Sequence, residues 1–272
     1  MKNLHIIMPM AGEGNRFKSK GYDIPKPLIR FEGKELYRHS LDSIYKSNLM
    51  TLLPSLNIKH TFIIRKEFIN EYKIDEQIKI FYPNANIISV EQTTRGSLET
   101  ALLAEPYIDL KNDAILILDS DIEFRCQQYY DALADELGFN QNLMKPLLLS
   151  FYSTDSRYSY AKCDKEINWW ATETAEKNPI STHALTGCYF LGMANQFIKY
   201  GKQLLDDFIN NKLNVNECYV SLLYNYYIKY YNEHGGRIRL IDFNMHTDNF
   251  WSYGTPEELT HYLTTKKNVW DK

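Results

Sequence analysis

Apolar residues in the first half of the chain occur in short runs that alternate with segments of helical spacing. The runs at 5–8, 61–64 and 85–90 predict strands, and the wholly apolar run Ala114–Leu118 predicts a strand that is buried on both faces. Between these runs, the apolar positions of 36–46, 67–80, 97–104 and 127–137 recur with the period of a helix. This alternation predicts an α/β fold with a Rossmann-like, mostly parallel sheet in the middle of three layers.

The second half of the chain has a different pattern. It predicts strands at 147–152, 160–163, 167–172, 185–191 and 238–243, and helices at 194–211, at 219–234 and from Pro256 onward. The tyrosine-rich segment Tyr219–Tyr231 has apolar positions every three or four residues, which favours a buried helix face over a ligand platform. No linker rich in Pro, Gly or Ser divides the halves. We therefore predict one domain over 1–272, with a core over about 1–145, a smaller mixed lobe over about 146–272, and a cleft between them.

The charge and composition narrow the classes of partner. The 272 residues include 31 Lys and Arg against 34 Asp and Glu, a net charge of −3, which does not favour binding to nucleic acid. No apolar run approaches the roughly 20 residues of a membrane span, and no signal-peptide pattern begins the chain. The four cysteines lack metal or redox spacing. We expect a cytoplasmic protein, monomer or homodimer, with neither nucleic acid nor a membrane as partner.

The segment that follows the first strand has the residue types of an anion-binding loop. It reads Met-Ala-Gly-Glu-Gly-Asn-Arg-Phe over 10–17 and continues to Pro25-Lys26-Pro27. Gly12 and Gly14 allow backbone N–H groups to approach an anion, while Arg16 and Lys26 add positive charge. The glycine spacing fits neither a dinucleotide-binding motif nor a P-loop. The cations, and the lysine held between two prolines, favour a triphosphate-binding loop over a plain turn.

Two carboxylates follow the buried strand, in Asp119-Ser120-Asp121. Ligands of open α/β sheets bind beyond the carboxyl ends of the strands, where these residues are expected. Carboxylate oxygens suit Mg²⁺, which commonly takes one or two of them together with substrate phosphates. The residues alone leave a second interpretation open, in which the aspartates cap a helix or form a turn.

These segments together resemble the sugar-phosphate nucleotidyltransferase family, which has a GT-A-like fold. The first is IIMPMAGEGNRF with the following PKPL, and the next is Gln92-x-x-x-Gly96-Ser97. LILDSD, which ends at Asp121, resembles the strand that carries a metal-binding aspartate. Later segments keep the family's order: Tyr160-Ala161, Glu176-Lys177-Asn178-Pro179, Thr186-Gly187-Cys188-Tyr189 and Trp251-Ser252-Tyr253-Gly254-Thr255-Pro256-Glu257-Glu258. The resemblance extends from Leu4 to about Leu263.

The resemblance implies a role for each matching residue. Arg16 would hold the β- and γ-phosphates, and Lys26 would contact the α-phosphate and the incoming phosphate. Asp121 would bind Mg²⁺. The implied nucleotide-binding residues are Met10, Ala11, Gly12, Gly14, Gln92, Gly96 and Ser97, of which Gln92 and Gly96 would read the base. The implied acceptor-binding residues are Tyr160, Glu176, Lys177 and Gly187.

Three positions depart from the family pattern. Ser252 stands where the family has its second metal-binding aspartate, and we predict that Asp248 supplies the missing carboxylate. Ala161 replaces a glycine, and Asn178 lengthens the Glu-Lys-Pro element. These departures resemble the branch found in capsule and surface-polysaccharide pathways, which includes cytidylyltransferases that act on non-sugar phosphates.

The implied reaction is Mg²⁺-dependent transfer of a nucleoside monophosphate from an NTP to a phosphorylated acceptor, with release of pyrophosphate. A sugar 1-phosphate is the acceptor we expect first, for the synthesis of nucleotide sugars and surface polysaccharide. The alternatives are a cytidylyltransferase on a non-sugar phosphate, a GT-A glycosyltransferase that uses Asp119-x-Asp121 for its metal, and a non-catalytic subunit. The glycosyltransferase does not explain the loop with Arg16 and Lys26, and the non-catalytic subunit would be expected to lack such residues.

Overall fold

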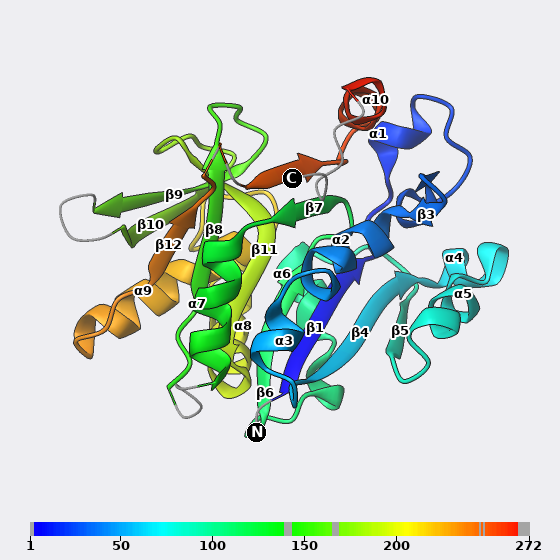
Figure 1. Ribbon diagram of the computed structural model, residues 1–272. Helices are drawn as coiled ribbons and strands as arrows, with labels where there is room; N and C mark the ends of the chain where they lie inside the picture. The colour runs from blue at the N-terminus through cyan, green and yellow to red at the C-terminus, as the bar shows by residue number, and fades with distance from the viewer. Residues whose placement is uncertain (1–2, 139–142, 165–168, 245, 247, 266–272) are drawn as a thin grey trace.

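The computed structural model describes residues 3–138, 143–164, 169–244, 246 and 248–265. Its described strands include a central sheet of nine, with helices packed on both faces (Figure 1). In spatial order these strands are β5 (Asn86–Val90), β4 (Asn57–Arg65), β1 (Asn3–Met10), β6 (Asp113–Leu118), β11 (His183–Met193), β8 (Leu147–Tyr152), β12 (Arg239–Asp242), β10 (Trp170–Glu176) and β9 (Ser159–Asp164). Residues of both halves of the chain therefore share one sheet.

The direction of the strands changes in the middle of this sheet. β5, β4, β1 and β6 run parallel, as the strand–helix alternation predicts. β11 then pairs antiparallel with both β6 and β8. β12 runs parallel to β8, whereas β10 is antiparallel to both of its neighbours, β12 and β9. The parallel strands predicted from the first half are thus present. The second half, predicted as a mixed lobe, adds mainly antiparallel pairs to the same sheet, because several of its connections are too short to hold a crossover helix.

Each face of the sheet is covered by its own set of helices, so the strands are apolar on both sides. In β6, Leu116 and Leu118 pack into one core cluster, whereas Ile115 and Ile117 pack into the other. The first cluster includes residues of α2 (Leu36–Tyr45), α3 (Leu49–Leu52), α4 (Lys66–Tyr72), α5 (Ile74–Phe81) and α7 (Gln127–Gly138). The second includes residues of α6 (Ser97–Leu102), α8 (Ala194–Ile209) and α9 (Leu223–Glu233). A search of the described helices finds none with the length and hydropathy of a membrane span.

Several predicted elements differ in extent from those observed. The helix predicted at 67–80 is divided into α4 and α5, because Lys73 between them has a left-handed backbone with φ of 52°. The strand predicted at 167–172 begins at Trp170, and residues 167 and 168 lie outside the described residues. The segment predicted as a helix over 219–234 begins with a 3₁₀ turn, η4 (Val220–Leu222), before α9.

A two-stranded sheet that the sequence pattern did not predict lies beside the end of β6. β7 (Ile122–Arg125) pairs antiparallel with β13 (Asn249–Ser252), which leads to α10 (Pro256–Thr265). A second such pair, β2 (Arg30–Phe31) with β3 (Lys34–Glu35), follows the loop after β1. β7 and β13 bring the C-terminal segment next to Asp121, since Tyr253 donates its backbone N–H to the Asp121 carbonyl at 2.6 Å.

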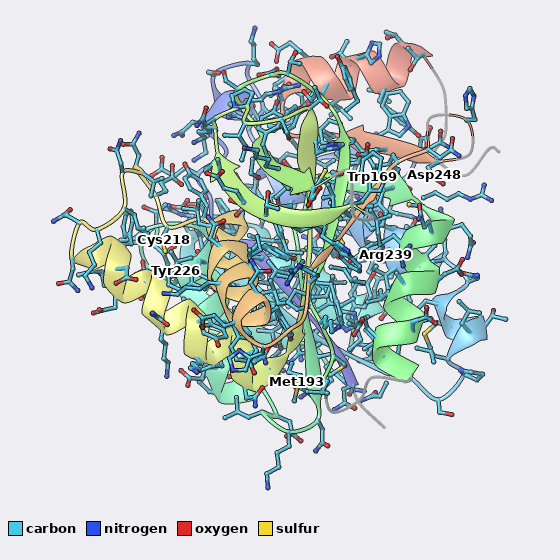
Figure 2. All side chains as sticks on the ribbon, turned by 90° about the vertical axis from the view of Figure 1, so that its left-hand side faces the viewer. Trp169, Met193, Cys218, Tyr226, Arg239 and Asp248 are labelled. Carbon is cyan, nitrogen blue, oxygen red and sulfur yellow. The ribbon has the colours of Figure 1, made fainter. Side chains whose placement is uncertain are left out.

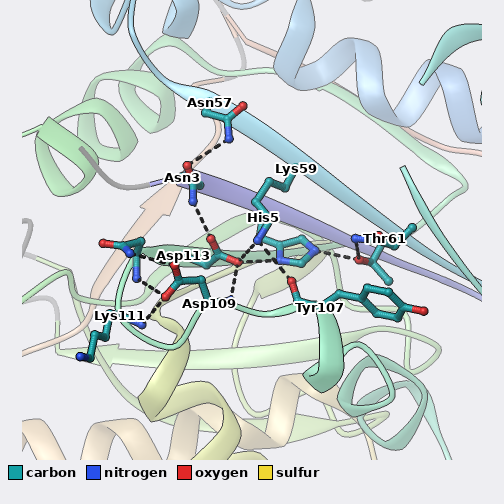
Figure 3. Close-up of polar contacts among 11 residues, drawn as sticks. Asn3, His5, Asn57, Lys59, Thr61, Tyr107, Asp109, Lys111 and Asp113 are labelled. Atoms are coloured by element: carbon teal, nitrogen blue, oxygen red, sulfur yellow. Dashed lines mark hydrogen bonds and ion pairs between the residues drawn. The ribbon is translucent and has the colours of Figure 1, made fainter. Parts of the chain in front are cut away.

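At the other end of the central strands, a buried polar network surrounds Asp113, the first residue of β6 (Figure 3). Asp113 Oδ2 lies 3.0 Å from His5 Nδ1 and accepts a hydrogen bond from Lys59 Nζ at 2.6 Å. Asn3 donates to the other oxygen, and His5 Nε2 lies 2.8 Å from Thr61 Oγ1. The network joins β1, β4 and β6 and satisfies the hydrogen bonding of a fully buried carboxylate.

Candidate active site

The predicted anion-binding loop lies at the carboxyl end of β1, where Gly14 begins the short helix α1 (Asn15–Lys18) with a φ of 69°. The backbone there is left-handed, which glycine adopts without strain. Lys26 opens the 3₁₀ turn η1 (Lys26–Leu28) after Pro25. Its Nζ donates to Asp121 Oδ2 at 2.6 Å, with the two side chains 25% and 18% exposed. The structure therefore brings the loop and the aspartates after β6 into direct contact.

Asp119, the first of the two aspartates, is held against Gly187 of β11. The Asp119 N–H donates to the Gly187 carbonyl at 2.9 Å, and a Cβ on Gly187 would stand 2.5 Å from Asp119 Oδ2. Burial raises the pKa of Asp119, and the negative charges of Asp121 and Glu176 raise it further, while Lys26 opposes them. Gly187 is thus required by the close approach of a carboxylate as well as by its φ of 92°.

A cavity of about 270 Å³ opens beside these aspartates. Its lining includes the predicted residues Arg16, Ser97, Asp121, Glu176 and Gly187 together with Asp119, Arg157, Tyr158, Ser159, Thr186, Tyr189, Tyr219 and Glu258. Glu176 accepts a hydrogen bond from Ser221 at 2.7 Å, and burial raises its pKa. Lys177 does not line this cavity itself but donates to the Tyr219 hydroxyl at 2.5 Å. Carboxylates and hydroxyls of this kind suit an acceptor with several hydroxyl groups.

A second cavity, of about 510 Å³, lies on the other side of the loop after β1. Five residues predicted to bind the nucleotide line it, namely Ala11, Gly12, Gly14, Gly96 and Ser97. Thr93, Thr94, Thr100 and Glu217 also line it. Gly96 has a φ of 149°, and a Cβ there would stand 2.4 Å from the Cys218 carbonyl oxygen. Ser97, the first residue of α6, lines both cavities, so the two spaces adjoin at the start of this helix.

Three predicted residues lie differently from the expectation. The Tyr160 side chain is fully buried and donates to the Asp155 carbonyl at 2.7 Å, and its neighbour Ser159 lines the cavity instead, because successive side chains of β9 point to opposite faces. Met10 packs its side chain into the core, so only its backbone is next to the loop. Gln92 is exposed and is not part of the second cavity's lining, and its role in reading the base stays a prediction.

The structure also corrects the position predicted for Asp248. Asp248 Oδ2 accepts a hydrogen bond from the Asn244 N–H at 2.9 Å and lies 3.4 Å from Cys126 Sγ. Cys126 follows β7, whereas Asp121 precedes it, and a four-residue strand spans roughly 13 Å. Figure 2 shows that Asp248 is also far from Cys218, whose backbone lies against Gly96 of the second cavity. Asp248 therefore does not share a metal ion with Asp121.

Several residues of the first cavity are not predicted by the sequence pattern. The apolar spacing predicts a buried helix face over Tyr219–Tyr231. This holds for Tyr224, Tyr227 and Tyr231 but not for Tyr219, which precedes η4 and lines the cavity. Tyr189 and Glu258 belong to segments that carry the family resemblance, so their presence in those segments was an available signal. Arg157 lies in the turn between β8 and β9 and has no such signal.

The chemistry of the donor set at Asp121 fits a magnesium ion. Asp121 Oδ2 accepts a hydrogen bond from the positively charged Lys26 ammonium group, and carboxylate oxygens are the ligands that Mg²⁺ prefers. Across the described residues, no group of three or more His, Cys, Asp or Glu side chains has a metal-binding arrangement. A magnesium ion here would therefore take much of its coordination from water and substrate phosphates, as is usual for this metal.

Comparison with known proteins supports this interpretation of the fold. No protein-family model matches the chain. The solved nucleoside-diphosphate-sugar pyrophosphorylase of Vibrio cholerae RC9 superposes with a TM-score of 0.72 at 23% identity, over 95% of this chain and 99% of that one. The inositol-1-phosphate CTP transferase of T. maritima superposes with a TM-score of 0.66 at 13% identity, over 98% and 96% of the two chains. The chain has the sugar-phosphate nucleotidyltransferase fold.

Sequence similarity within this nucleotidyltransferase fold extends to curated proteins, although at low identity. The mannose-1-phosphate guanyltransferases of Saccharomyces cerevisiae and Debaryomyces hansenii are each 23% identical to this chain over 135 residues. The match covers 50% of this chain and about a third (34%) of each yeast protein. The family resemblance that the sequence analysis stated is thus confirmed for the fold.

Proposed function

We propose that this protein is a Mg²⁺-dependent nucleotidyltransferase, which moves a nucleoside monophosphate from an NTP to a phosphorylated acceptor and releases pyrophosphate. The observation that carries the proposal is the 2.6 Å contact between Lys26 and Asp121. It joins the glycine-containing loop of the larger cavity to the carboxylates of the smaller one. The α-phosphate of a bound NTP has to meet the acceptor phosphate at such a junction.

The reaction needs positioning and charge more than it needs a base. The acceptor phosphate is already ionised, so one of its oxygens attacks the α-phosphorus in line while the bond to pyrophosphate breaks. Lys26 and Arg16 offset the negative charge that develops during this step. Mg²⁺, held by Asp121, would supply further positive charge to the phosphate oxygens. A cavity between two parts of the chain excludes water, which would otherwise compete with the acceptor.

The acceptor we favour is a sugar 1-phosphate. Glu176, Thr186, Tyr189 and Tyr219 line the smaller cavity and offer hydrogen-bonding groups for sugar hydroxyls. We assign residues of about 1–145 to the nucleotide and residues of about 146–272 chiefly to the acceptor and to closure of the site. Because NTPs and sugar phosphates occur in the cytoplasm, we place the reaction there. Synthesis of nucleotide sugars for capsule or surface polysaccharide is the pathway class we propose.

The test is pyrophosphate release from a matrix of substrates. Each of ATP, GTP, CTP, UTP and dTTP is combined with a panel of sugar 1-phosphates, inositol 1-phosphate and non-sugar phosphate monoesters. We expect one NTP and one sugar 1-phosphate to react best. Preference for CTP with a non-sugar phosphate would select the second candidate, which the extra Asn178 favours. Release of NDP from a nucleotide sugar, with no release of pyrophosphate in any combination, would instead identify a glycosyltransferase.

A further inference from the structure

The segment between β13 and α10 encloses a small space beside Asp121 that Gly254 keeps open. A Cβ on Gly254 would stand 3.1 Å from Asp121 Oδ2, 3.4 Å from Glu258 Oε2 and 3.5 Å from Ser252 Oγ. Oxygen atoms from three separate side chains thus lie within 3.5 Å of one point, the position that a Cβ of residue 254 would occupy. The backbone of Tyr253 is hydrogen-bonded to the Asp121 carbonyl at 2.6 Å, which fixes this segment against the end of β6.

Glu258 presents one of its two oxygens to this space and uses the other elsewhere. Its Oε1 accepts a hydrogen bond from the Tyr158 hydroxyl at 2.9 Å and forms an ion pair with Arg157 Nη2 at 2.9 Å. These two contacts hold the carboxylate in the first turn of α10 with Oε2 directed toward Gly254. Because Arg157 and Tyr158 come from the β8–β9 turn, the orientation of Glu258 is fixed from a different part of the chain than Asp121.

The types of donor atom around the point also suit a cation. Asp121 Oδ2, the oxygen on the Gly254 side, is the one that binds the Lys26 ammonium group. Two carboxylates and a hydroxyl are hard oxygen donors, and a divalent cation needs only one or two protein carboxylates when phosphates and water complete its shell. Ser252, at the position of the family's second aspartate, supplies the hydroxyl.

We propose that Glu258 is the second carboxylate of the metal site, and that it replaces the aspartate missing at position 252. Asp121 and Glu258 bind one divalent cation, with the Ser252 hydroxyl next to it. The inference rests on the proposed function only in the choice of Mg²⁺ as the physiological ion. The binding of a cation to these residues can be measured with no substrate present.

The experiment titrates the full-length protein with Mn²⁺ alone and follows the electron paramagnetic resonance signal of the free ion. Glu258→Gln removes one negative charge without changing the size of the side chain, and we expect it to weaken Mn²⁺ binding about tenfold or more. Glu257→Gln is the matched control, because Glu257 is the next residue, is 65% exposed and pairs with Lys20. We expect Mn²⁺ affinity to be unchanged in this control.

A rescue variant separates binding from a structural role of Glu258. Ser252→Asp combined with Glu258→Gln restores a second carboxylate at the family position, and we expect it to recover most of the Mn²⁺ affinity. If Glu258 only held Arg157 and Tyr158, this aspartate would raise Mn²⁺ affinity by the same factor in the wild-type protein as in Glu258→Gln, whereas a ligand role predicts a much smaller gain in the wild-type protein. Gly254→Ala fills the space with no change of charge, and we expect it to weaken Mn²⁺ binding as well. Thermal melting of each variant verifies that it is folded.

Two results would overturn the inference. One is Mn²⁺ binding by the folded Glu258→Gln protein as tight as that of wild type, and the other is absence of Mn²⁺ binding in wild type. The proposed reaction fails on a different measurement, namely absence of pyrophosphate release from the substrate matrix. Loss of that activity with intact, Glu258-dependent Mn²⁺ binding would leave the metal site standing.

Discussion

Strand β6 begins at Asp113 and is followed directly by Asp119 and Asp121, so each end of one strand carries aspartate next to a lysine. At the first end, Asp113 is fully buried and receives hydrogen bonds from several neighbours, including Lys59. At the second end, Asp121 and Lys26 are partly exposed and line or adjoin a cavity. The same residue types therefore form a closed polar network where the carboxylate is enclosed, and we propose that they take part in the reaction where it faces open space.

Glycine accounts for much of this difference. Gly187 and Gly254 leave room beside Asp119 and Asp121, whose oxygens a Cβ would crowd at 2.5 and 3.1 Å. At Asp113 the corresponding space is occupied by the His5 ring and the Lys59 side chain. A carboxylate whose surroundings already satisfy it cannot exchange partners, whereas one next to a cleared space can bind a substrate or an ion.

Lys26→Ala tests the open end and has the largest effect that we expect. Removing one preorganised positive charge should lower kcat for pyrophosphate release by about 10²–10³. The KM for NTP should move much less, because the contact is strongest in the transition state. Stopped assays on the best substrate pair give both constants. Lys20→Ala, which removes an exposed lysine from the same loop, is the control, and equal losses in the two variants would contradict the role of Lys26.

Asp113→Ala tests the enclosed end. It leaves His5 and Lys59 without their acceptor, and breaking a buried pair costs about 3 kcal/mol of unfolding free energy, near the low end of the usual range because Lys59 can reach water. Urea unfolding measures this loss. At temperatures where the variant is folded, kcat should match wild type. Asp109→Ala removes a nearby exposed carboxylate and should cost less; a similar cost for both would mean that burial of Asp113 does not matter.

The pH dependence of stability should also come from the enclosed end. Burial tends to raise the pKa of Asp113, but hydrogen bonds from His5, Lys59 and Asn3 outweigh it and hold the pKa well below its usual range. A carboxyl whose pKa is lowered on folding stabilises the protein above its unfolded pKa of about 3.9, and this stabilisation is lost as the pH falls further. The test is urea unfolding of wild type and Asp113→Asn from about pH 5 to about pH 3, a range that spans the unfolded pKa. The difference in unfolding free energy between the two proteins should shrink as the solution becomes acidic. A constant difference would contradict the lowered pKa.

The two ends also differ in how far the sequence could predict them. The run 114–118 predicts a buried strand, and a ligand site at its carboxyl end follows from the rule for open α/β sheets. His5, Thr61 and Lys59 are far apart in sequence and carry no motif, so nothing in the pattern predicts that β1, β4 and β6 bring them to Asp113. Register between strands is a long-range property.

The errors at the open end have the same physical origin. Tyr160 was chosen from a motif, but the alternation of β9 directs Ser159 to the cavity instead. Asp248 was chosen because it is close in sequence to the closing segment, and a strand of four residues, β13, then carries it away from Asp121. The sequence pattern does not predict β7 and β13 because each has only four residues and their pairing joins segments that are far apart in the sequence. Several motif residues in loops thus line the cavities, whereas the positions of Tyr160 and Asp248 are decided by the alternation or the length of a strand.

Asp248→Asn should have the smallest effect. Asp248 accepts a hydrogen bond from the Asn244 N–H and lies beside Cys126, a position that serves a turn before β13. An asparagine oxygen can accept the same bond, so we expect a loss of about 1 kcal/mol or less in unfolding free energy. The Mg²⁺ concentration that gives half-maximal rate should equal that of wild type, because the proposed metal site at Asp121 lies at the other end of β7. A rate assay across a Mg²⁺ titration decides the matter. A clear rightward shift of that titration in Asp248→Asn would return Asp248 to the metal site and show that the segment before β13 rearranges when substrates bind.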